Sequence, residues 1–281
     1  MSGGFPKIIH QIYNFWDNKT PSKIRERMDN WKNTHPDFKY ILWNKKKSRD
    51  FIKKKYNWFL PIWDRYPYTI QCADAIRYFI LYEYGGIYSD IDLDPVKPID
   101  GLLQKYSDKN ILLYKSPNSG LITNDFMVSK KGMSFWKRSW YELIKNHNVD
   151  YYSKHITVMY STGPLLLDYV YEQHKNRKNG AYCVPTSIIN NCDIASIKPC
   201  YNKGAYLRRY DGNSWHSIDS SILNIMYKNK FLISIIICII LAFTIYNLYK
   251  HKIPTQSTTI QDILPLYQQL EVDSIPKPTL I

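Results

Sequence analysis

Three aspartates stand at alternate positions before the middle of the chain, directly after a glycine pair. Asp90, Asp92 and Asp94 are separated by Ile91 and Leu93. Because a β-strand turns successive side chains to opposite faces, this spacing predicts three carboxylates on one face and the two apolar side chains in the core. Three like charges in a row repel unless a cation neutralises them. Clustered carboxylate oxygens favour a hard divalent cation, Mg²⁺ or Mn²⁺, usually shared with the phosphates of a substrate.

A helix that carries an acid and a base is expected before the acidic strand. Residues 72–84 place apolar side chains at helical spacing, and Gly85 should end the helix, because glycine readily adopts the conformation that closes one. Asp74 and Arg77 lie three residues apart and therefore share one face of this helix. We expect that face to border the same crevice as the acidic strand. The alternative is a surface ion pair between the two side chains.

Strand-like and helix-like segments alternate around these residues. Apolar alternation predicts strands over residues 7–16, 38–43, 110–114, 121–129 and 182–189. Helical spacing predicts helices over residues 22–34, 45–56, 72–84, 133–147 and 163–174. Pro61 and Pro67 indicate a loop. The predicted fold class is α/β, with a mixed, mostly parallel central sheet flanked by helices, and ligands of such sheets bind at the carboxyl ends of the strands.

The composition fits one large domain with a basic surface. Of 281 residues, 44% are hydrophobic, and the net charge of +14 is concentrated before residue 230. The densest basic stretch, residues 45–55, is followed by Trp58, Phe59 and Trp63. It could rest on anionic lipid headgroups, and a solvated helix face is the equal alternative. We expect no nucleic-acid binding, because no zinc-finger, helix-turn-helix or RNA-binding motif accompanies the charge.

The five cysteines do not indicate a zinc site, because none of them forms a CxxC pair. One disulfide among Cys183, Cys192 and Cys200 is conceivable in a luminal domain. Free thiols fit a cytosolic domain better.

Residues 231–249 form an apolar run of 19 residues without a charge. At about 1.5 Å per residue, a helix of this length crosses a bilayer core of about 30 Å. A buried core helix is the alternative, but it would normally show a polar face. We therefore expect a globular domain over residues 1–227, a single transmembrane anchor over residues 228–252 and a flexible tail over residues 253–281.

The expected orientation of this anchor leaves the globular domain in the cytosol. The first residues do not resemble a signal peptide, since a lysine occurs at position 7 and no long apolar segment follows. Lysines flank the apolar run on both sides, so the positive-inside rule does not decide the orientation. The Golgi or endoplasmic reticulum lumen remains the alternative.

Several separated segments resemble one family, the glycosyltransferases with an Asp-x-Asp sugar-binding region (family 32). The central part is the most specific, with Ala-Asp-Ala-Ile-Arg-Tyr at residues 73–78 and Gly-Gly-Ile-Tyr-Ser-Asp-Ile-Asp at residues 85–92. Further matches are Pro-Lys-Ile-Ile-His-Gln-Ile at residues 6–12, the segment of residues 31–43, Asn-Asp at 124–125, Thr-Gly-Pro at 162–164 and Ser-Trp-His at 214–216. The resemblance covers nearly all of residues 6–217. It implies a GT-A type fold, a nucleotide-sugar donor, a divalent metal and retention of the anomeric configuration.

The resemblance also implies roles for the acids. Asp92 would ligate the metal directly, whereas Asp90 would contact the ribose and reach the metal through water. His216 would supply a second protein contact to the metal or to the diphosphate. Asp94 is a supporting carboxylate. The expected catalytic residues are Asp90, Asp92 and Arg77.

The donor would be held by side chains from the helix, the acidic strand and two later segments. By resemblance these are Asp74, Arg77, Asp90, Asn124, Asp125, Ser214 and Trp215. Arg77 could clamp a sugar hydroxyl or a phosphate oxygen, and the indole of Trp215 could donate to a phosphate. Tyr13 stands where many relatives carry tryptophan, so base stacking is not assigned to it; Trp16 is the alternative. No side chain is an unambiguous nucleophile, which favours front-face displacement with the leaving diphosphate taking the acceptor's proton.

The function expected from these observations is a membrane-anchored, metal-dependent retaining glycosyltransferase. The donor is GDP-mannose or a UDP-hexose, with mannose favoured by resemblance, and the acceptor is a lipid or a glycan. One alternative is a catalytically silent, membrane-anchored protein that binds nucleotide-sugars. The other is an Asp-x-Asp phosphatase of the haloacid dehalogenase type, which Leu93 and the position of the motif along the chain disfavour.

Overall fold

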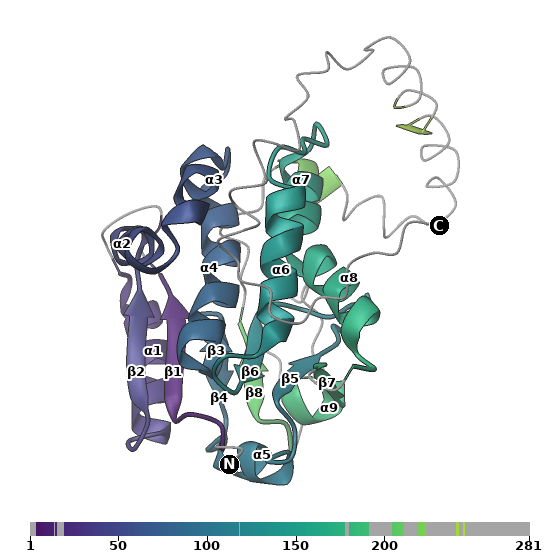
Figure 1. The fold of residues 1–281 in the computed structure, drawn as a ribbon. Coiled ribbons are helices and arrows are strands. Elements are labelled where there is room, and N and C mark those ends of the chain that lie inside the picture. The colour runs from purple at the N-terminus through teal and green to yellow at the C-terminus, as the bar shows by residue number, and fades with distance from the viewer. Residues whose placement is uncertain are drawn as a thin grey trace. The chain divides into compact units, whose positions relative to one another are not determined.

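The computed structural model describes residues 4–13, 15, 20–117, 119–177, 180–190, 204–210, 218–222, 240–241 and 244 (Figure 1). The chain divides into two compact units, residues 1–219 and 220–281. All the named strands and helices belong to the first unit. Within the described ranges no helix is both long and apolar enough to cross a membrane. The predicted span of residues 231–249 lies outside those ranges except for residues 240, 241 and 244.

The first unit is built on a six-stranded mixed sheet in the order β2-β1-β3-β6-β5-β7 (Figure 1). These strands are β2 (Lys39–Trp43), β1 (Ile8–Ile12), β3 (Gly86–Ser89), β6 (Phe126–Ser129), β5 (Ile111–Tyr114) and β7 (Tyr182–Val184). Only β6 is antiparallel to its neighbours in this sheet. The predicted α/β class with a mixed, mostly parallel sheet is confirmed.

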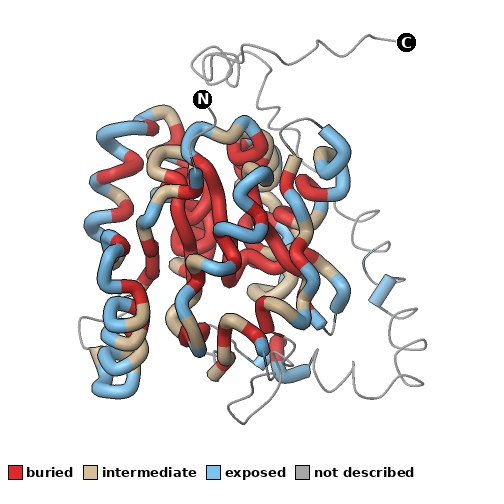
Figure 2. Tube along the Cα trace, turned by 90° about the horizontal axis from the view of Figure 1, so that it is seen from below, coloured by how far each residue is buried: buried red, intermediate tan, exposed pale blue. Residues whose placement is uncertain are grey.

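Helices cover both faces of this sheet. They are α1 (Ser22–Thr34), α2 (Lys45–Lys55), α3 (Leu60–Arg65), α4 (Thr69–Tyr84), α5 (Asp100–Lys105), α6 (Ser134–Lys145), α7 (Lys154–Ser161), α8 (Pro164–His174) and α9 (Thr186–Ile189), with a 3-10 turn η1 (Asn57–Phe59). One core cluster joins Trp31 of α1, Leu102 of α5 and Ile189 of α9 to strand residues Ile87 and Val128. The buried residues gather along the central strands, with the exposed ones around the periphery (Figure 2).

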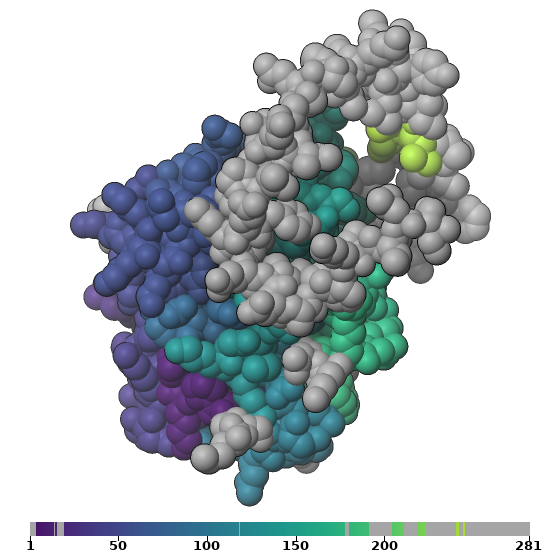
Figure 3. Space-filling model, viewed as in Figure 1, coloured from purple at the N-terminus to yellow at the C-terminus, as the bar shows by residue number. Residues whose placement is uncertain are grey.

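The other face of the sheet packs against aromatic side chains of α4 and α6. The rings of Phe79 and Trp140 are stacked with centroids 4.8 Å apart, and those of Tyr78 and Trp136 are stacked at 5.9 Å. The indole of Trp136 donates to the Ser129 hydroxyl of β6 at 2.8 Å. In the space-filling view the N-terminal elements β1, β2 and α2 lie to the left and α8 to the right (Figure 3).

The glycine pair allows α4 to turn directly into the centre of the sheet. Gly85 and Gly86 have φ values of +64° and +91°, which side chains with a Cβ rarely adopt. A Cβ on Gly86 would lie 2.4 Å from the carbonyl oxygen of Ile8 in β1. Both glycines are therefore required by backbone conformation and by close neighbours, since a Cβ on Gly85 would lie 2.7 Å from the Lys131 amide nitrogen.

The acidic segment is not one strand, so the prediction of three carboxylates on one face is wrong. Strand β3 ends at Ser89, and the chain turns through residues 90–92, where the Leu93 amide donates to the Asp90 carbonyl at 3.1 Å. Strand β4 (Leu93–Pro95) then pairs with β8 (Leu207–Arg209) in a separate two-stranded sheet. Leu93 is fully buried as expected, whereas Ile91 is half-buried.

Other predicted elements differ in extent. Of the expected strand over residues 121–129, only β6 forms a strand. The expected strand over residues 182–189 is divided at Pro185 into β7 and α9. The expected loop at Pro61 is α3, because proline fits the first turn of a helix, where its missing N–H is not needed. The short elements α5, α7 and β8 were not predicted. Cys72 and Cys183 are free thiols.

Candidate functional site

Asp74 and Arg77 form a buried ion pair at the carboxyl end of β3. The Arg77 Nη2 lies 3.0 Å from the Asp74 Oδ1 and 3.2 Å from the Asp90 Oδ1. Asp74 and Arg77 are only 4% and 5% exposed, so the alternative of a surface ion pair is wrong. The guanidinium of Arg77 therefore ties the helix α4 to the turn that carries Asp90.

Asn124, just before β6, completes this half of the site. Its side-chain amide donates to the Asp74 Oδ1 at 3.1 Å, and its backbone carbonyl oxygen accepts from the Arg77 Nη1 at 2.9 Å. On the other side of Asp74, the hydroxyl of Thr162 donates to the Asp74 Oδ2 at 3.4 Å. The structure thus brings together three of the predicted residues, Asp74, Arg77 and Asn124, with Asp90.

A second half of the site is held by Arg209, which sequence reasoning missed. Its Nη1 lies 3.1 Å from the Asp92 Oδ2, and its Nη2 donates to the Asp125 Oδ2. Tyr114 donates to the same Asp125 oxygen at 3.0 Å. Arg209 lies in β8, a strand of three residues that was not predicted. The available signal was the pair Arg208 and Arg209 shortly before the Ser-Trp-His segment.

Asp94 is separate from this cluster. Its carboxylate accepts from Asn30 of α1 at 2.7 Å and from Arg208 of β8 at 2.9 Å. These contacts join α1 to the small β4–β8 sheet. Asp94 therefore supports the framework of the site, and it does not face Arg77 or Arg209.

The cluster carries more negative than positive charge. Four buried or half-buried carboxylates face two guanidiniums, which leaves two negative charges uncompensated among these side chains when all are ionised. The acids are Asp74, Asp90, Asp92 and Asp125. In addition, the Asp92 Oδ1 and the Asp125 Oδ1 are buried without a hydrogen-bond partner among the described residues. Such orphaned anionic oxygens are costly unless a cation meets them.

These features fit a divalent cation in charge and in donor type. Asp92 and Asp125 each offer one free oxygen, and Asp90 lies two residues before Asp92 in the same turn. Within the described ranges, no three His, Cys, Asp or Glu side chains form a complete metal-binding group. The remaining ligands would come from substrate phosphates or from residues outside those ranges.

The titration of the acids reflects the same imbalance. Burial raises the pKa of Asp90 to about 7, with further raising by the charges of Asp92 and Asp125 and an opposing effect of Arg77. Burial also raises the pKa of Asp92, and Arg209 opposes that rise. Burial raises the pKa of Asp74 against the opposing charge of Arg77. A cation placed among these groups would stabilise their ionised forms.

Some predicted site residues lie outside the described residues: Ser214, Trp215, His216 and Trp16. Tyr13 is half-buried at the end of β1, where its amide donates to the Trp43 carbonyl at 2.9 Å. Gln11 was not predicted, although its amide donates to the Asp90 carbonyl at 3.4 Å and its oxygen accepts from Tyr40 at 2.7 Å.

His10, in the matching segment of residues 6–12, is a structural residue. Its Nε2 lies 3.0 Å from the Gly85 carbonyl, and its Nδ1 accepts from the Trp43 indole at 3.2 Å. Burial lowers the pKa of His10 to about 4, so the ring is neutral at physiological pH. It holds the turn between α4 and β3 in place.

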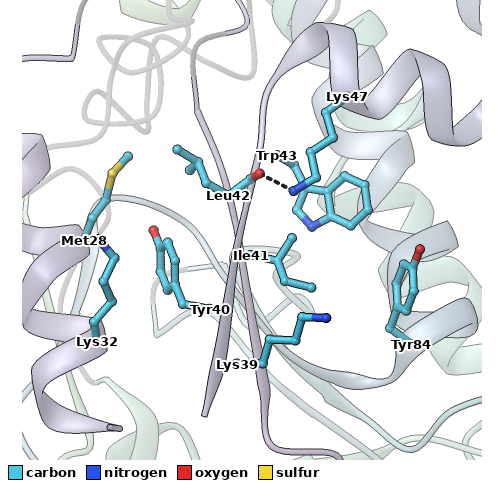
Figure 4. Close-up of a pocket in the computed structure, with 9 residues that line it drawn as sticks. All are labelled: Met28, Lys32, Lys39, Tyr40, Ile41, Leu42, Trp43, Lys47 and Tyr84. Carbon is cyan, nitrogen blue, oxygen red and sulfur yellow. Dashed lines mark hydrogen bonds between the residues drawn. The ribbon is translucent and has the colours of Figure 1, made fainter.

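A groove of about 630 Å³ follows the outer edge of the sheet at β2 and contains none of the predicted site residues. Tyr40 and Leu42 point to one side of the strand, whereas Lys39, Ile41 and Trp43 point to the other (Figure 4). The Lys47 ammonium donates to the Leu42 carbonyl at 3.0 Å. Lysines along an edge strand oppose its pairing with another chain, which accounts for the charge of this groove.

Comparison with known proteins agrees with this arrangement. Residues 21–109 match the family model described as a glycosyltransferase sugar-binding region containing a DXD motif. Inositol phosphoceramide mannosyltransferase 2 of Schizosaccharomyces pombe is 32% identical over 240 residues, which are 83% of this chain and 64% of that protein. A mannosyl phosphorylinositol ceramide synthase of Saccharomyces cerevisiae is 32% identical over 247 residues, 85% of this chain and 57% of that protein.

The chain thus spans about three-fifths of the length of these two relatives. An uncharacterized glycosyltransferase of Acanthamoeba polyphaga mimivirus is 28% identical over 82% of this chain and 91% of that protein. Among solved structures, the PaToxG glycosyltransferase aligns with a TM-score of 0.45 and 18% identity, over 60% of this chain and 70% of that chain. The matched region contains both the Asp74–Arg77 pair and the acidic turn, and in it the chain matches the glycosyltransferase family whose sugar-binding region carries the DXD motif.

Proposed function

We propose that this chain is a metal-dependent, retaining glycosyltransferase of the GT-A type that transfers a hexose from a nucleotide-sugar. The observation that carries the proposal is the acid cluster around the turn of residues 90–92. Its carboxylates are buried or half-buried, it is short of two positive charges when all four acids are ionised, and two of its carboxylate oxygens have no partner among the described residues. Buried anionic oxygens of this kind are usually satisfied, which favours a bound cation.

The acids divide into two groups of proposed roles. Asp92 and Asp125 would hold the cation through their free oxygens, with Asp90 nearby and His216 as the predicted further ligand. The bound cation would stabilise the negative charge that grows on a diphosphate leaving group as the glycosidic bond breaks. No distance to the cation is implied by the structure.

The other group orients the sugar and the ribose. Arg77 of α4 forms an ion pair with Asp90 and so holds its carboxylate in one position. In that position Asp90 would accept a hydrogen bond from a ribose hydroxyl. Asp74 and Asn124 are bonded to each other and to Arg77, and they present polar atoms for sugar hydroxyls at the carboxyl end of β3. Ser214 and Trp215 are proposed to bind the diphosphate, by resemblance alone.

The acceptor is proposed to be a lipid. The names of two relatives refer to inositol phosphoceramide and to mannosyl phosphorylinositol ceramide, and the predicted apolar run of residues 231–249 would keep the chain at a membrane. The same relatives favour mannose as the transferred sugar and GDP-mannose as the donor. A UDP-hexose donor and a glycan acceptor are the alternatives.

The direct test is metal-dependent nucleotide binding by the full chain in detergent. We expect GDP or UDP to bind only with Mn²⁺ or Mg²⁺, and Asp92→Asn to abolish the binding. Asp94→Asn is the matched control, because Asp94 contacts Asn30 and Arg208 outside the cluster. Metal-independent binding that persists in Asp92→Asn would refute the proposal.

Hydrolysis of a panel of nucleotide-sugars then identifies the donor. A chain that binds nucleotide with metal but neither hydrolyses nor transfers any sugar would be the catalytically silent alternative. Release of phosphate from a phosphomonoester instead would indicate the phosphatase alternative.

A further inference from the structure

Three exposed tyrosines lie at α7, outside the acid cluster. Tyr151 and Tyr152 immediately precede the N-cap of α7, and Tyr160 is near its last turn. Their exposed fractions are 42%, 89% and 48%, and the rings of Tyr151 and Tyr160 lie 5.2 Å apart. We call these three residues the tyrosine patch. None of them contributes to the site described above, so their exposure requires another explanation.

The loop that presents Tyr152 is held by hydrogen bonds. Tyr152 has a φ of +57°, a conformation that non-glycine residues seldom adopt and that costs about 1 kcal/mol or more. Its amide donates to the Asp150 Oδ1 at 2.9 Å, and the Tyr151 amide donates to the buried Thr157 hydroxyl at 3.0 Å. The Ser153 side chain caps α7 by accepting from the Ile156 amide. A large aromatic side chain is therefore displayed to solvent by a defined, strained backbone.

The end of the first compact unit is attached to this same loop. The Asp219 Oδ2 accepts from the Ser153 hydroxyl and from the His155 amide, both at 2.8 Å. Ile218, the neighbour of Asp219, is 80% exposed. The predicted membrane span begins at residue 231, twelve residues after Asp219. Twelve residues of fully extended chain reach at most about 40 Å. The first unit thus ends beside the tyrosine patch.

We infer that the tyrosine patch is a membrane-contact surface that sits in the lipid headgroup layer beside the point where the chain enters the bilayer. Tyrosine has an apolar ring and a polar hydroxyl, and it is enriched at membrane–water interfaces for that reason. Ile218 adds an apolar side chain beside the patch. The inference rests on the predicted span, and it extends the proposed function by orienting the site toward a lipid acceptor.

Helix α7 connects this surface to the acid cluster. Its eight residues span about 12 Å. At its other end, the Thr162 hydroxyl contacts Asp74 at 3.4 Å, and the Thr162 carbonyl accepts from Tyr78 of α4 at 2.7 Å. Tyr160 of the patch lies two residues before Thr162, so the patch extends along α7 to the end that contacts Asp74. With the patch in the headgroup layer, a sugar acceptor on a lipid headgroup would lie near the acid cluster.

Hydroxyl-radical footprinting of the full chain in phosphatidylcholine–phosphatidylserine nanodiscs tests the contact directly. Tyr182 in β7 is the internal control, because it is 38% exposed and lies far from α7 (Figure 1). We expect Tyr152 to be modified at least about threefold more slowly than Tyr182, although its ring is the more exposed in the protein alone. Faster modification of Tyr152 than of Tyr182 would overturn the inference. So would a chain that does not enter the nanodisc, or protection of Tyr152 by a co-purified soluble protein only.

A second measurement separates this inference from the proposed function. The variant with Tyr151, Tyr152 and Tyr160 changed to Ser should lower transfer to a lipid acceptor in vesicles about tenfold through a higher KM, and should leave nucleotide-sugar hydrolysis unchanged. Tyr182→Ser is the matched control and should change neither rate. Footprinting needs no turnover, so protection of Tyr152 in a chain without transferase activity would support the membrane surface and refute the proposed function. Equal loss of hydrolysis and transfer in the triple variant would refute the surface role.

Discussion

Replacing Arg209 by glutamine should destabilise the metal-free protein by about 3–5 kcal/mol, the usual cost of removing one partner of a buried ion pair. The guanidinium is 8% exposed and serves both Asp92 and Asp125, whose side chains are 11% and 7% exposed. Without Arg209, both carboxylates lose the guanidinium that pairs with them, in a site that already carries excess negative charge. A divalent cation should restore much of the loss, because it supplies the missing positive charge.

The assay is urea unfolding of the purified full chain at pH 7, with and without excess Mn²⁺, because a cation that binds only the folded protein raises its stability. Arg208→Gln removes the same charge from the adjacent residue, whose side chain is 38% exposed and contacts Asp94. It should cost about 1 kcal/mol or less, with no change in the effect of Mn²⁺. If Arg209→Gln unfolds like the parent protein, or if Mn²⁺ stabilises both variants equally, the idea that a divalent cation can replace the charge of Arg209 is refuted.

Three further predictions follow from the titration, the glycine pair and the expected anchor. Burial raises the pKa of Asp90 to about 7, so the stability that Asp90 contributes to the metal-free protein is present below its unfolded pKa of about 4 and is lost as pH rises through about 7. Unfolding measurements between about pH 4 and pH 8 should therefore show a decrease in stability that Asp90→Asn flattens. An unchanged pH dependence in the variant would contradict the assignment. Gly86→Ala should cost about 3 kcal/mol or more, because its Cβ would lie 2.4 Å from the Ile8 carbonyl at a φ of +91°, whereas Gly132→Ala, at a φ of +75° with nothing within 4 Å, should cost about 1 kcal/mol; equal thermal shifts would exclude the steric explanation. In sealed membranes, added protease should degrade residues 1–219 if the domain is cytosolic, and a protected domain would establish the luminal alternative.

The long helices and the central strands could be predicted from the sequence because their patterns are local. Helix α1 matches its predicted bounds, and α4 differs only at its start, where Thr69 precedes the first strongly apolar turn. The short elements α5, α7 and β8 were missed because three to eight residues give little periodicity. Their positions depend on tertiary contacts, such as the pairing of Leu93 with Arg209 between β4 and β8.

The candidate acids were found from the sequence, but their partners were not. Asp74 and Arg77 are three residues apart, so their pairing follows from helix geometry. Arg209 is 117 residues from Asp92, and no local pattern connects the two. Asp125 was expected among the side chains that hold the donor, whereas the structure places it against Arg209, next to the acid that is proposed to bind the metal.

The turn that replaces the expected acidic strand determines the geometry of the proposed cation site. On a continuous strand, Asp90 and Asp92 would face the same way about 6–7 Å apart. One basic side chain of the protein could then pair with both carboxylates. The turn after Ser89 instead directs Asp90 to Arg77 of α4 and Asp92 to Arg209 of β8. Each acid is held by its own guanidinium from a separate element, which fixes its position before any ligand binds. The guanidiniums still leave two negative charges and two free oxygens, and this deficit matches the charge of one divalent cation.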